Sequence, residues 1–177
     1  MASSLDSFQL AAENSYSSDS DYSGDLECLD LSYVMLHTST LSQHLDVVAS
    51  EGVEGKKKAA DYECMLLNNN LLTNLPDTLA SFHNLRILDV SSNNLTHLPD
   101  AVLHLNNLTS LVVKNNQISD AGVPKIGQCS SLKEVNFSGN VLSRFPPQFL
   151  ELEKLKFLYV GGNRINELPR EIFKLKK

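Results

Sequence analysis

Cysteine is scarce in this 177-residue chain, and no pair of cysteines is closely spaced. The three present are Cys28, Cys64 and Cys129, an odd number with no CxxC motif. Disulfide-stapled folds and zinc sites both depend on paired or clustered cysteines. The pattern therefore favours neither, and we expect no bound metal and no other cofactor.

Long apolar runs are also missing. None approaches the roughly 20 residues that a membrane span needs. The opening MASSLDSFQL lacks the basic region and apolar core of a secretory signal. Three NxS/T sequons, at Asn94, Asn107 and Asn136, would matter only in the secretory pathway. We therefore expect a cytoplasmic protein with no membrane partner.

Basic residues are absent from the first 55 residues, which carry ten Asp or Glu. The rest of the chain holds all fifteen Lys and Arg. This asymmetry indicates an acidic tail beside a mildly basic domain, and we predict that the Ser- and Asp-rich residues 1–24 are disordered. A net charge of −6 argues against nucleic acid as a partner.

Signatures of catalysis are missing as well. Neither GxxxxGK[ST] nor GxGxxG occurs, and Gly161-Gly162 belongs to a repeating pattern. The histidines are not grouped with a carboxylate and a nucleophile. We predict no catalytic residues, no small-molecule substrate and no enzymatic activity.

A repeated grid of residues dominates what is present. In LRILDVSSNNLTHLP the grid is Leu85, Leu88, Val90, Asn93 and Leu95, and it recurs at steps of 23 or 24 residues from Tyr62 to Ile165. Apolar residues two apart lie on one face of a strand. A period in the twenties with this spacing is typical of a leucine-rich repeat solenoid, an α/β fold with a curved parallel sheet on its concave face and short helices or turns on its convex face.

The grid divides the chain into segments. Five repeats cover 62–177, as 62–84, 85–107, 108–131, 132–154 and 155–177, and no C-terminal cap follows. Residues 25–61 are predicted to form an atypical capping coil, in which Val34 replaces the asparagine and Leu41, Leu45 and Val48 have helical spacing. The uncapped end indicates a piece of a longer protein; a truncated gene or dimerisation through that end are alternatives.

Two residue types in the grid have structural explanations. The asparagines at its fourth position carry donors and acceptors that can bond the backbone where the chain turns out of each strand. This predicted ladder consists of Asn70, Asn93, Asn116, Asn140 and Asn163. A proline after a leucine or phenylalanine, as in Leu98-Pro99, suits the start of a short convex-side helix or turn; in the third repeat Val123-Pro124 is shifted, which predicts a different turn there.

Strand residues that point away from the core line the concave face, where several apolar side chains are predicted to be exposed. Apolar patches with polar neighbours are typical of protein-binding sites. The candidate partner-binding residues are Leu66, Ile87, Asp89, Val112, Lys114, Glu134, Asn136, Phe157 and Tyr159. Because Asp89 and Glu134 lie among apolar residues, we expect a protein partner with apolar and some basic character.

The runs DVSSNNLTHLP, LVVKNNQISDAGVPK, EVNFSGNVLSRFP and FLYVGGNRINELP make residues 26–177 resemble the intracellular leucine-rich repeat family, which includes the Ras-pathway scaffold and Scribble-like proteins. The resemblance implies a non-enzymatic, cytosolic protein-binding module or scaffold. A substrate-recognition subunit of a ubiquitin ligase and a Ras-type scaffold in signal transduction are the alternatives.

Overall fold

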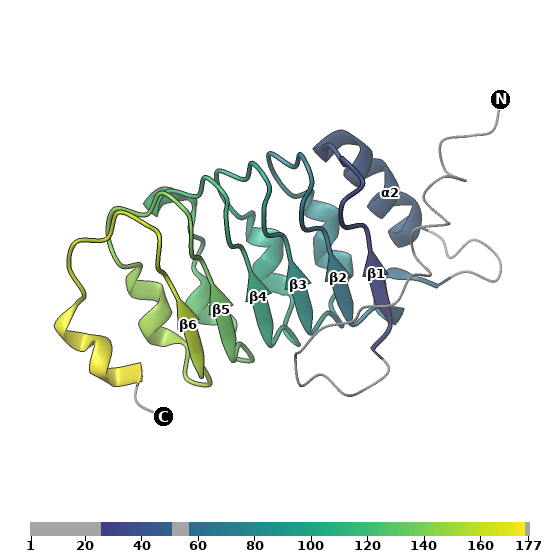
Figure 1. The fold of residues 1–177 in the computed structure, drawn as a ribbon. Coiled ribbons are helices and arrows are strands. Elements are labelled where there is room, and N and C mark those ends of the chain that lie inside the picture. Colours follow the sequence, from purple (N-terminus) through teal and green to yellow (C-terminus); the bar gives the residue numbers. More distant parts are fainter. Residues whose placement is uncertain (1–25, 51–56, 176–177) are drawn as a thin grey trace.

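Successive coils of the chain stack side by side into an open arc, with strands on one side and short helices on the other (Figure 1). The computed structural model describes residues 26–50 and 57–175. The acidic tail predicted for residues 1–24 lies outside the described residues.

Six three-residue strands form one parallel sheet in sequence order. They are β1 (Cys28–Asp30), β2 (Cys64–Leu66), β3 (Ile87–Asp89), β4 (Ser110–Val112), β5 (Glu134–Asn136) and β6 (Phe157–Tyr159). The register follows the grid, since Leu88 pairs with Met65 on one side and Leu111 on the other. The predicted solenoid with a parallel sheet is confirmed.

The convex side is built mostly from 3-10 helices. They are η1 (Ala59–Asp61), η2 (Asp77–Ser81), η3 (Asp100–His104), η4 (Asp120–Gly122), η5 (Ile126–Gln128), η6 (Pro147–Glu151) and η7 (Arg170–Leu175). Pro76 and Pro99 directly precede η2 and η3 with φ of −75° and −72°. That preset angle suits the entry into a helical turn. The third repeat has two short helices, η4 and η5, where its neighbours have one, which agrees with its shifted proline.

The first described coil carries a true α-helix, α2 (Thr38–Ser50), in place of a 3-10 turn. Leu41 and Leu45 are fully buried, and Val48 packs against the core. The Thr38 hydroxyl accepts hydrogen bonds from the backbone N–H groups of Thr73 and Asn74, at 3.1 and 3.3 Å. These contacts tie the start of α2 to the following coil.

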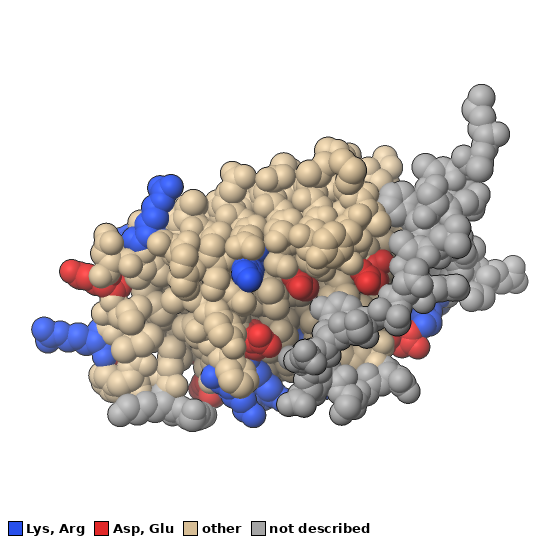
Figure 2. Space-filling model, in the orientation of Figure 1, with Lys and Arg blue, Asp and Glu red and all other residues tan. Residues whose placement is uncertain are grey.

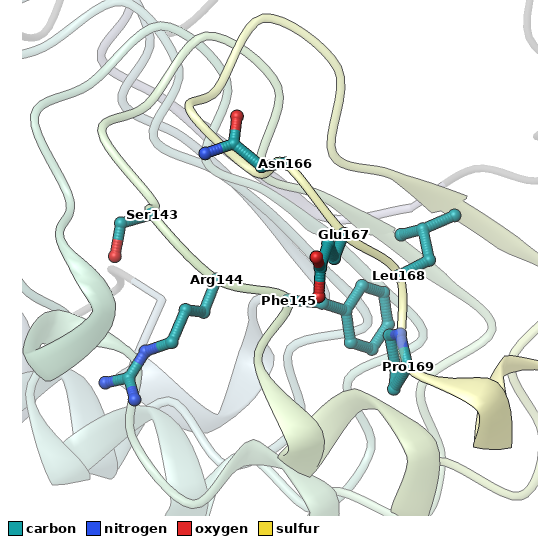
Figure 3. Close-up of a pocket in the computed structure, with 7 residues that line it drawn as sticks. All are labelled: Ser143, Arg144, Phe145, Asn166, Glu167, Leu168 and Pro169. Carbon is teal, nitrogen blue, oxygen red and sulfur yellow. The ribbon is translucent and has the colours of Figure 1, made fainter.

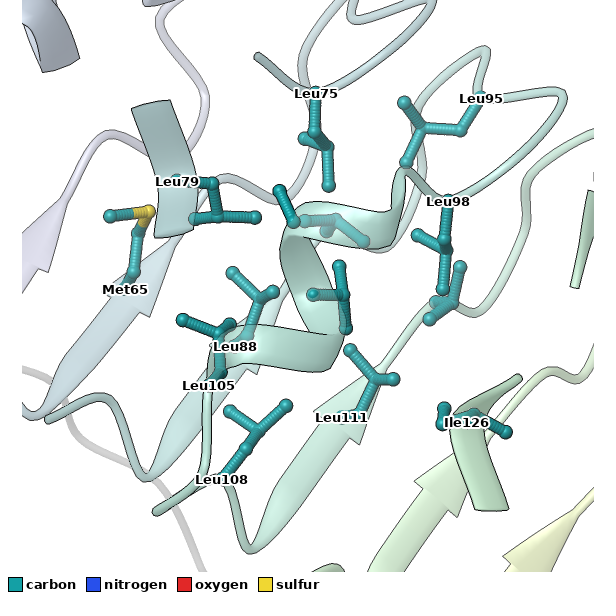
Figure 4. Packing of buried hydrophobic residues seen from close by; sticks show 14 of the residues in the cluster. Met65, Leu75, Leu79, Leu88, Leu95, Leu98, Leu105, Leu108, Leu111 and Ile126 are labelled. Atoms are coloured by element: carbon teal, nitrogen blue, oxygen red, sulfur yellow. The ribbon is translucent and has the colours of Figure 1, made fainter. Parts of the chain in front are cut away.

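The core runs through the array as a stack of leucine-rich layers. The central residue of a strand points inward and meets apolar residues from the convex helices, as Leu88, Leu111, Leu79 and Leu105 do in Figure 4. Leu88 and Leu111 have no exposed surface. Burying such a side chain stabilises the fold by roughly 1.5–3 kcal/mol, so repeated burial of this kind holds neighbouring coils in register.

Candidate partner-binding surface

The strands keep their positions through a column of asparagine amides. Asn93 Nδ2 donates to the Leu67 carbonyl of the preceding coil at 2.9 Å and to its own coil's Val90 carbonyl at 3.1 Å. Its Oδ1 accepts from the Leu72 N–H of the preceding coil at 3.0 Å. The same pattern occurs at Asn70, Asn116, Asn140 and Asn163. Each amide therefore bridges two coils at the point where the chain leaves the strand.

The first described coil lacks this asparagine, yet its turn is bonded. Asn70 Oδ1 accepts from the N–H groups of Val34 and Leu36 at 3.2 and 2.8 Å, and Asn70 Nδ2 donates to the Leu31 carbonyl at 2.7 Å. An asparagine thus serves the coil before it as well as its own. Val34 can replace asparagine because the amide that its coil needs comes from the next repeat.

The first and third residues of each strand face away from the core and form the concave surface. On this side, uncharged residues predominate, single charged side chains lie among them, and a group of Lys and Arg side chains lies at the lower edge (Figure 2). The surface is uneven. Phe157 and Tyr159 on β6 are 55% and 45% exposed, and Lys114 is exposed beyond the end of β4. The outward-facing residues of β3, β4 and β5 are partly buried, namely Ile87, Asp89, Val112, Glu134 and Asn136.

One predicted contact residue does not belong to the exposed set. Leu66 is only 4% exposed, so the prediction that it offers surface to a partner is wrong. Strand alternation correctly puts it on the outward side, but β1 and β3 flank it in register with Asp30 and Asp89. The apolar surface that remains accessible lies toward β6.

The polar residues of the surface are engaged within the chain. Asp89 Oδ1 accepts from the Ser91 N–H at 2.8 Å, and Asn136 Oδ1 accepts from the Ser138 N–H at 3.0 Å. Bonds to the backbone two residues on are typical of Asx turns. The Ser110 hydroxyl on β4 lies 3.2 Å from Glu134 Oε2. Asp89 and Asn136 therefore shape the strand ends, while the carboxylates of Asp89 and Glu134 still contribute negative charge to the surface.

Two cysteines that are 36 positions apart in the sequence lie side by side on adjacent strands. Cys28 on β1 and Cys64 on β2 are register partners, and their sulfur atoms lie 2.6 Å apart. All three cysteines are free thiols. Their spacing along the chain did not reveal this contact, because the first coil is longer than the others. The available signal was the grid itself, since each cysteine directly precedes the central strand residue, Leu29 or Met65.

An open hollow of about 440 Å³ lies at the connections that follow β5 and β6. Its lining consists of Ser143, Arg144, Phe145, Asn166, Glu167, Leu168 and Pro169, drawn in Figure 3. Of these, Arg144 lies 3.5 Å from Asp120 Oδ2, so its charge is directed to the preceding coil. The hollow is a feature of two adjacent loops and contains no nucleophile beside a histidine.

Other kinds of site find little support in the described part of the chain. Across residues 26–50 and 57–175, no three His, Cys, Asp or Glu side chains gather as metal ligands. No helix within those ranges is long and apolar enough to cross a bilayer.

Comparisons with known proteins agree with this architecture. A leucine-rich repeat family profile matches residues 64–118 and 106–165. Leucine-rich repeat-containing protein 58 of Xenopus laevis is 36% identical over 122 residues, which are 69% of this chain and 33% of that protein. The chain thus spans about a third of the length of that curated relative.

Solved structures show the same architecture. An internalin from Listeria monocytogenes superposes with a TM-score of 0.57 at 27% identity, over 66% of this chain and 32% of that one. A plant peptide hormone receptor, RGFR1, in complex with RGF2 gives 0.55 at 25% identity, over 64% and 19%. A Leptospira interrogans leucine-rich repeat protein gives 0.60 at 22% identity over 98% and 50%, a likeness of fold alone.

Proposed function

Because the chain belongs to the leucine-rich repeat family, whose domains typically serve as protein-interaction modules, we propose that it binds a protein partner through its concave surface. The observation that carries this proposal is the exposure of Phe157 and Tyr159, two aromatic side chains on one three-residue strand. Aromatic residues, tyrosine above all, are enriched among the residues that dominate binding energy.

The surface also supports a chemical class of partner. Partly exposed Ile87 and Val112 add apolar surface on β3 and β4, separated from the aromatic residues of β6 by Glu134 and Asn136 of β5. Asp89 and Glu134 add negative charge to the same surface. A segment that presents apolar side chains together with a lysine or arginine complements this arrangement. The partner that fits best is therefore an extended or loop segment of a protein with mixed apolar and basic character.

The similar structures give independent support for the class of ligand. The plant receptor RGFR1, which shares the fold at 25% identity, is a peptide hormone receptor solved in complex with RGF2. Repeat solenoids bind on the extended concave surface that their curvature creates. The scaffold role, the ubiquitin-ligase and Ras-type alternatives, and a cytoplasmic location remain predictions.

The test compares affinity capture from cell extract by the chain and by a double variant, Val112→Arg with Tyr159→Arg. Both substitutions place a large charged side chain on the concave surface without removing a core residue. We expect the specific partners to be lost while the circular dichroism spectrum is retained. The captured proteins, identified by mass spectrometry, would also separate a scaffold from a ubiquitin-ligase subunit.

A matched control carries the same number of added charges elsewhere. Asn106, in the turn between η3 and β4, and Gln128, on η5, are exposed and lie outside the strands, so Asn106→Arg with Gln128→Arg should capture the same proteins as the unaltered chain. If the concave variant and this control capture identical partners, the binding site is not the concave surface and the proposal fails.

A further inference from the structure

The contact between Cys28 and Cys64 has no role in the proposed binding function. The two residues lie directly opposite each other on adjacent parallel strands, and the Cys28 thiol donates toward Cys64 Sγ at 2.6 Å. Cys129 offers an internal comparison. It is buried on the convex side, where its nearest polar contact is the Val102 carbonyl at 4.0 Å.

We propose that Cys28 and Cys64 form a reversible intramolecular disulfide when the protein meets a low-molecular-weight disulfide. Bridging requires Cα atoms about 4.4–6.8 Å apart, and adjacent strands are spaced by roughly 4.7–4.9 Å. The sulfurs must approach by only about half an ångström to reach the bond length of about 2.05 Å. The parallel pairing of β1 and β2 therefore already holds the two residues at a spacing that a disulfide can bridge.

The reaction balances with oxidised glutathione as the oxidant. One cysteine, after losing its proton, attacks the glutathione disulfide, forms a mixed disulfide and releases one glutathione thiolate. The second cysteine then attacks the protein-bound sulfur, which closes the Cys28–Cys64 bond and releases the second glutathione. Two protein thiols are oxidised, one glutathione disulfide is reduced to two thiols, and the two protons pass to the released thiolates.

Access and protonation set the rate. Cys28 is only partly buried, so the oxidant can reach it, whereas Cys64 is 7% exposed and is suited to the second, intramolecular step. The hydrogen bond to Cys64 and burial raise the pKa of the Cys28 thiol. Because the thiolate is the attacking form, closure should be slow at neutral pH and faster as the pH rises.

The bond would join the first described coil to the repeat array. It closes a loop between residues 36 positions apart in the sequence. A cross-link of that span restricts the unfolded chain and stabilises the folded one. For a chain of this size, the melting temperature should rise by about 5–10 °C.

The experiment treats the full chain with oxidised glutathione at pH 8.5 and maps its peptides under non-reducing conditions. Trypsin cleaves after Lys58, so Cys28 and Cys64 fall in separate peptides, and Cys129 falls in a third. We expect a single cross-link between the first two, a monomeric product, and a rise in melting temperature that dithiothreitol reverses. Cys129→Ser should behave like the unaltered chain, and Cys28→Ser should lose both the cross-link and the temperature rise.

Two results would overturn the proposal. One is that Cys28 and Cys64 keep free thiols while a control dithiol peptide, added to the same solution, is oxidised. The other is stable glutathionylation of either cysteine, or cross-linking to Cys129 or to a second chain, without the Cys28–Cys64 bond. Cys64→Ser provides a second variant, so that a folding defect in Cys28→Ser does not decide the outcome.

Discussion

Replacing Asn116 with alanine tests whether the asparagine ladder stabilises the array. Asn116 is buried, and its Oδ1 accepts from the Leu95 N–H of the preceding coil at 3.0 Å. Its Nδ2 donates to the Val90 carbonyl of that coil and to the Val113 carbonyl of its own, both at 3.0 Å. Alanine makes none of these bonds, which leaves the Leu95 N–H without a partner. The two carbonyls keep a second donor each, because Asn93 Nδ2 donates to the Val90 carbonyl at 3.1 Å and Asn140 Nδ2 donates to the Val113 carbonyl at 3.0 Å.

The expected cost follows from the unpaired Leu95 N–H. A buried backbone donor that loses its partner costs about 1–3 kcal/mol. The two carbonyls lose only one of their two amide donors, so they add little to that cost. Domains are typically stable by about 5–15 kcal/mol. The Asn116→Ala variant should therefore still fold at 25 °C and unfold at a clearly lower urea concentration.

Urea unfolding followed by far-ultraviolet circular dichroism measures the change in the free energy of unfolding. Asn94→Ala is the matched control, because Asn94 is exposed and its amide has only a 3.4 Å contact with exposed Gln117; its cost should stay within about 0.5 kcal/mol. Asn163→Ala should fall between the two, since Asn163 is only partly buried. If Asn116→Ala costs no more than Asn94→Ala, the amides are not what holds the turns.

Two further substitutions test local backbone and charge effects. Gly139 has a φ of +68°, and an added Cβ would lie 2.4 Å from Asn115 Oδ1. Gly139→Ala should therefore lower the free energy of unfolding by about 1–2 kcal/mol. Gly161 has open space around its Cβ position, so Gly161→Ala should leave the thermal midpoint nearly unchanged. Burial lowers the pKa of His44, so the unfolded chain binds a proton more readily than the folded one, and stability should fall as the pH drops below about 6.5. Urea midpoints at pH 7.5 and 5.5 should differ less in His44→Gln than in the unaltered chain, and an equal difference would contradict the assignment.

The sequence was sufficient to predict the stacking of the coils because the same five positions recur in each repeat. Leu88 and Leu111 align by counting alone, and the structure pairs them. The shifted proline at Pro124 likewise predicted an altered turn in the third repeat, where two 3-10 helices lie. These features follow from local spacing, which repetition makes unambiguous.

The surface was less predictable, because alternation determines the side of a strand and not the depth at which a residue lies. Leu66 and Tyr159 occupy equivalent outward positions, yet one is buried and the other is exposed. Tyr159 is open on one side, since β6 pairs only with β5 among the described strands, whereas Leu66 has Asp30 and Asp89 beside it on β1 and β3. The contact between Cys28 and Cys64 was not predictable from a fixed period for a related reason: α2 lengthens the first coil, so the two cysteines are 36 positions apart.

In the asparagine ladder, the side chain of one repeat bonds the turn of the preceding coil. Val34 occupies the asparagine position of the first described coil, but Asn70 bonds that coil's turn, so the departure leaves Leu36 N–H paired. Removing one asparagine should therefore affect the turn of the preceding coil more than the turn of its own coil. In Asn116→Ala, the N–H of Leu95 in the preceding coil should lose protection from hydrogen exchange. The N–H of Ile118, which lies beyond Asn116 in its own coil, is bonded by Asn140 at 2.9 Å and should keep its protection. Equal loss at both amides would mean that the coils open together and that the ladder has no direction.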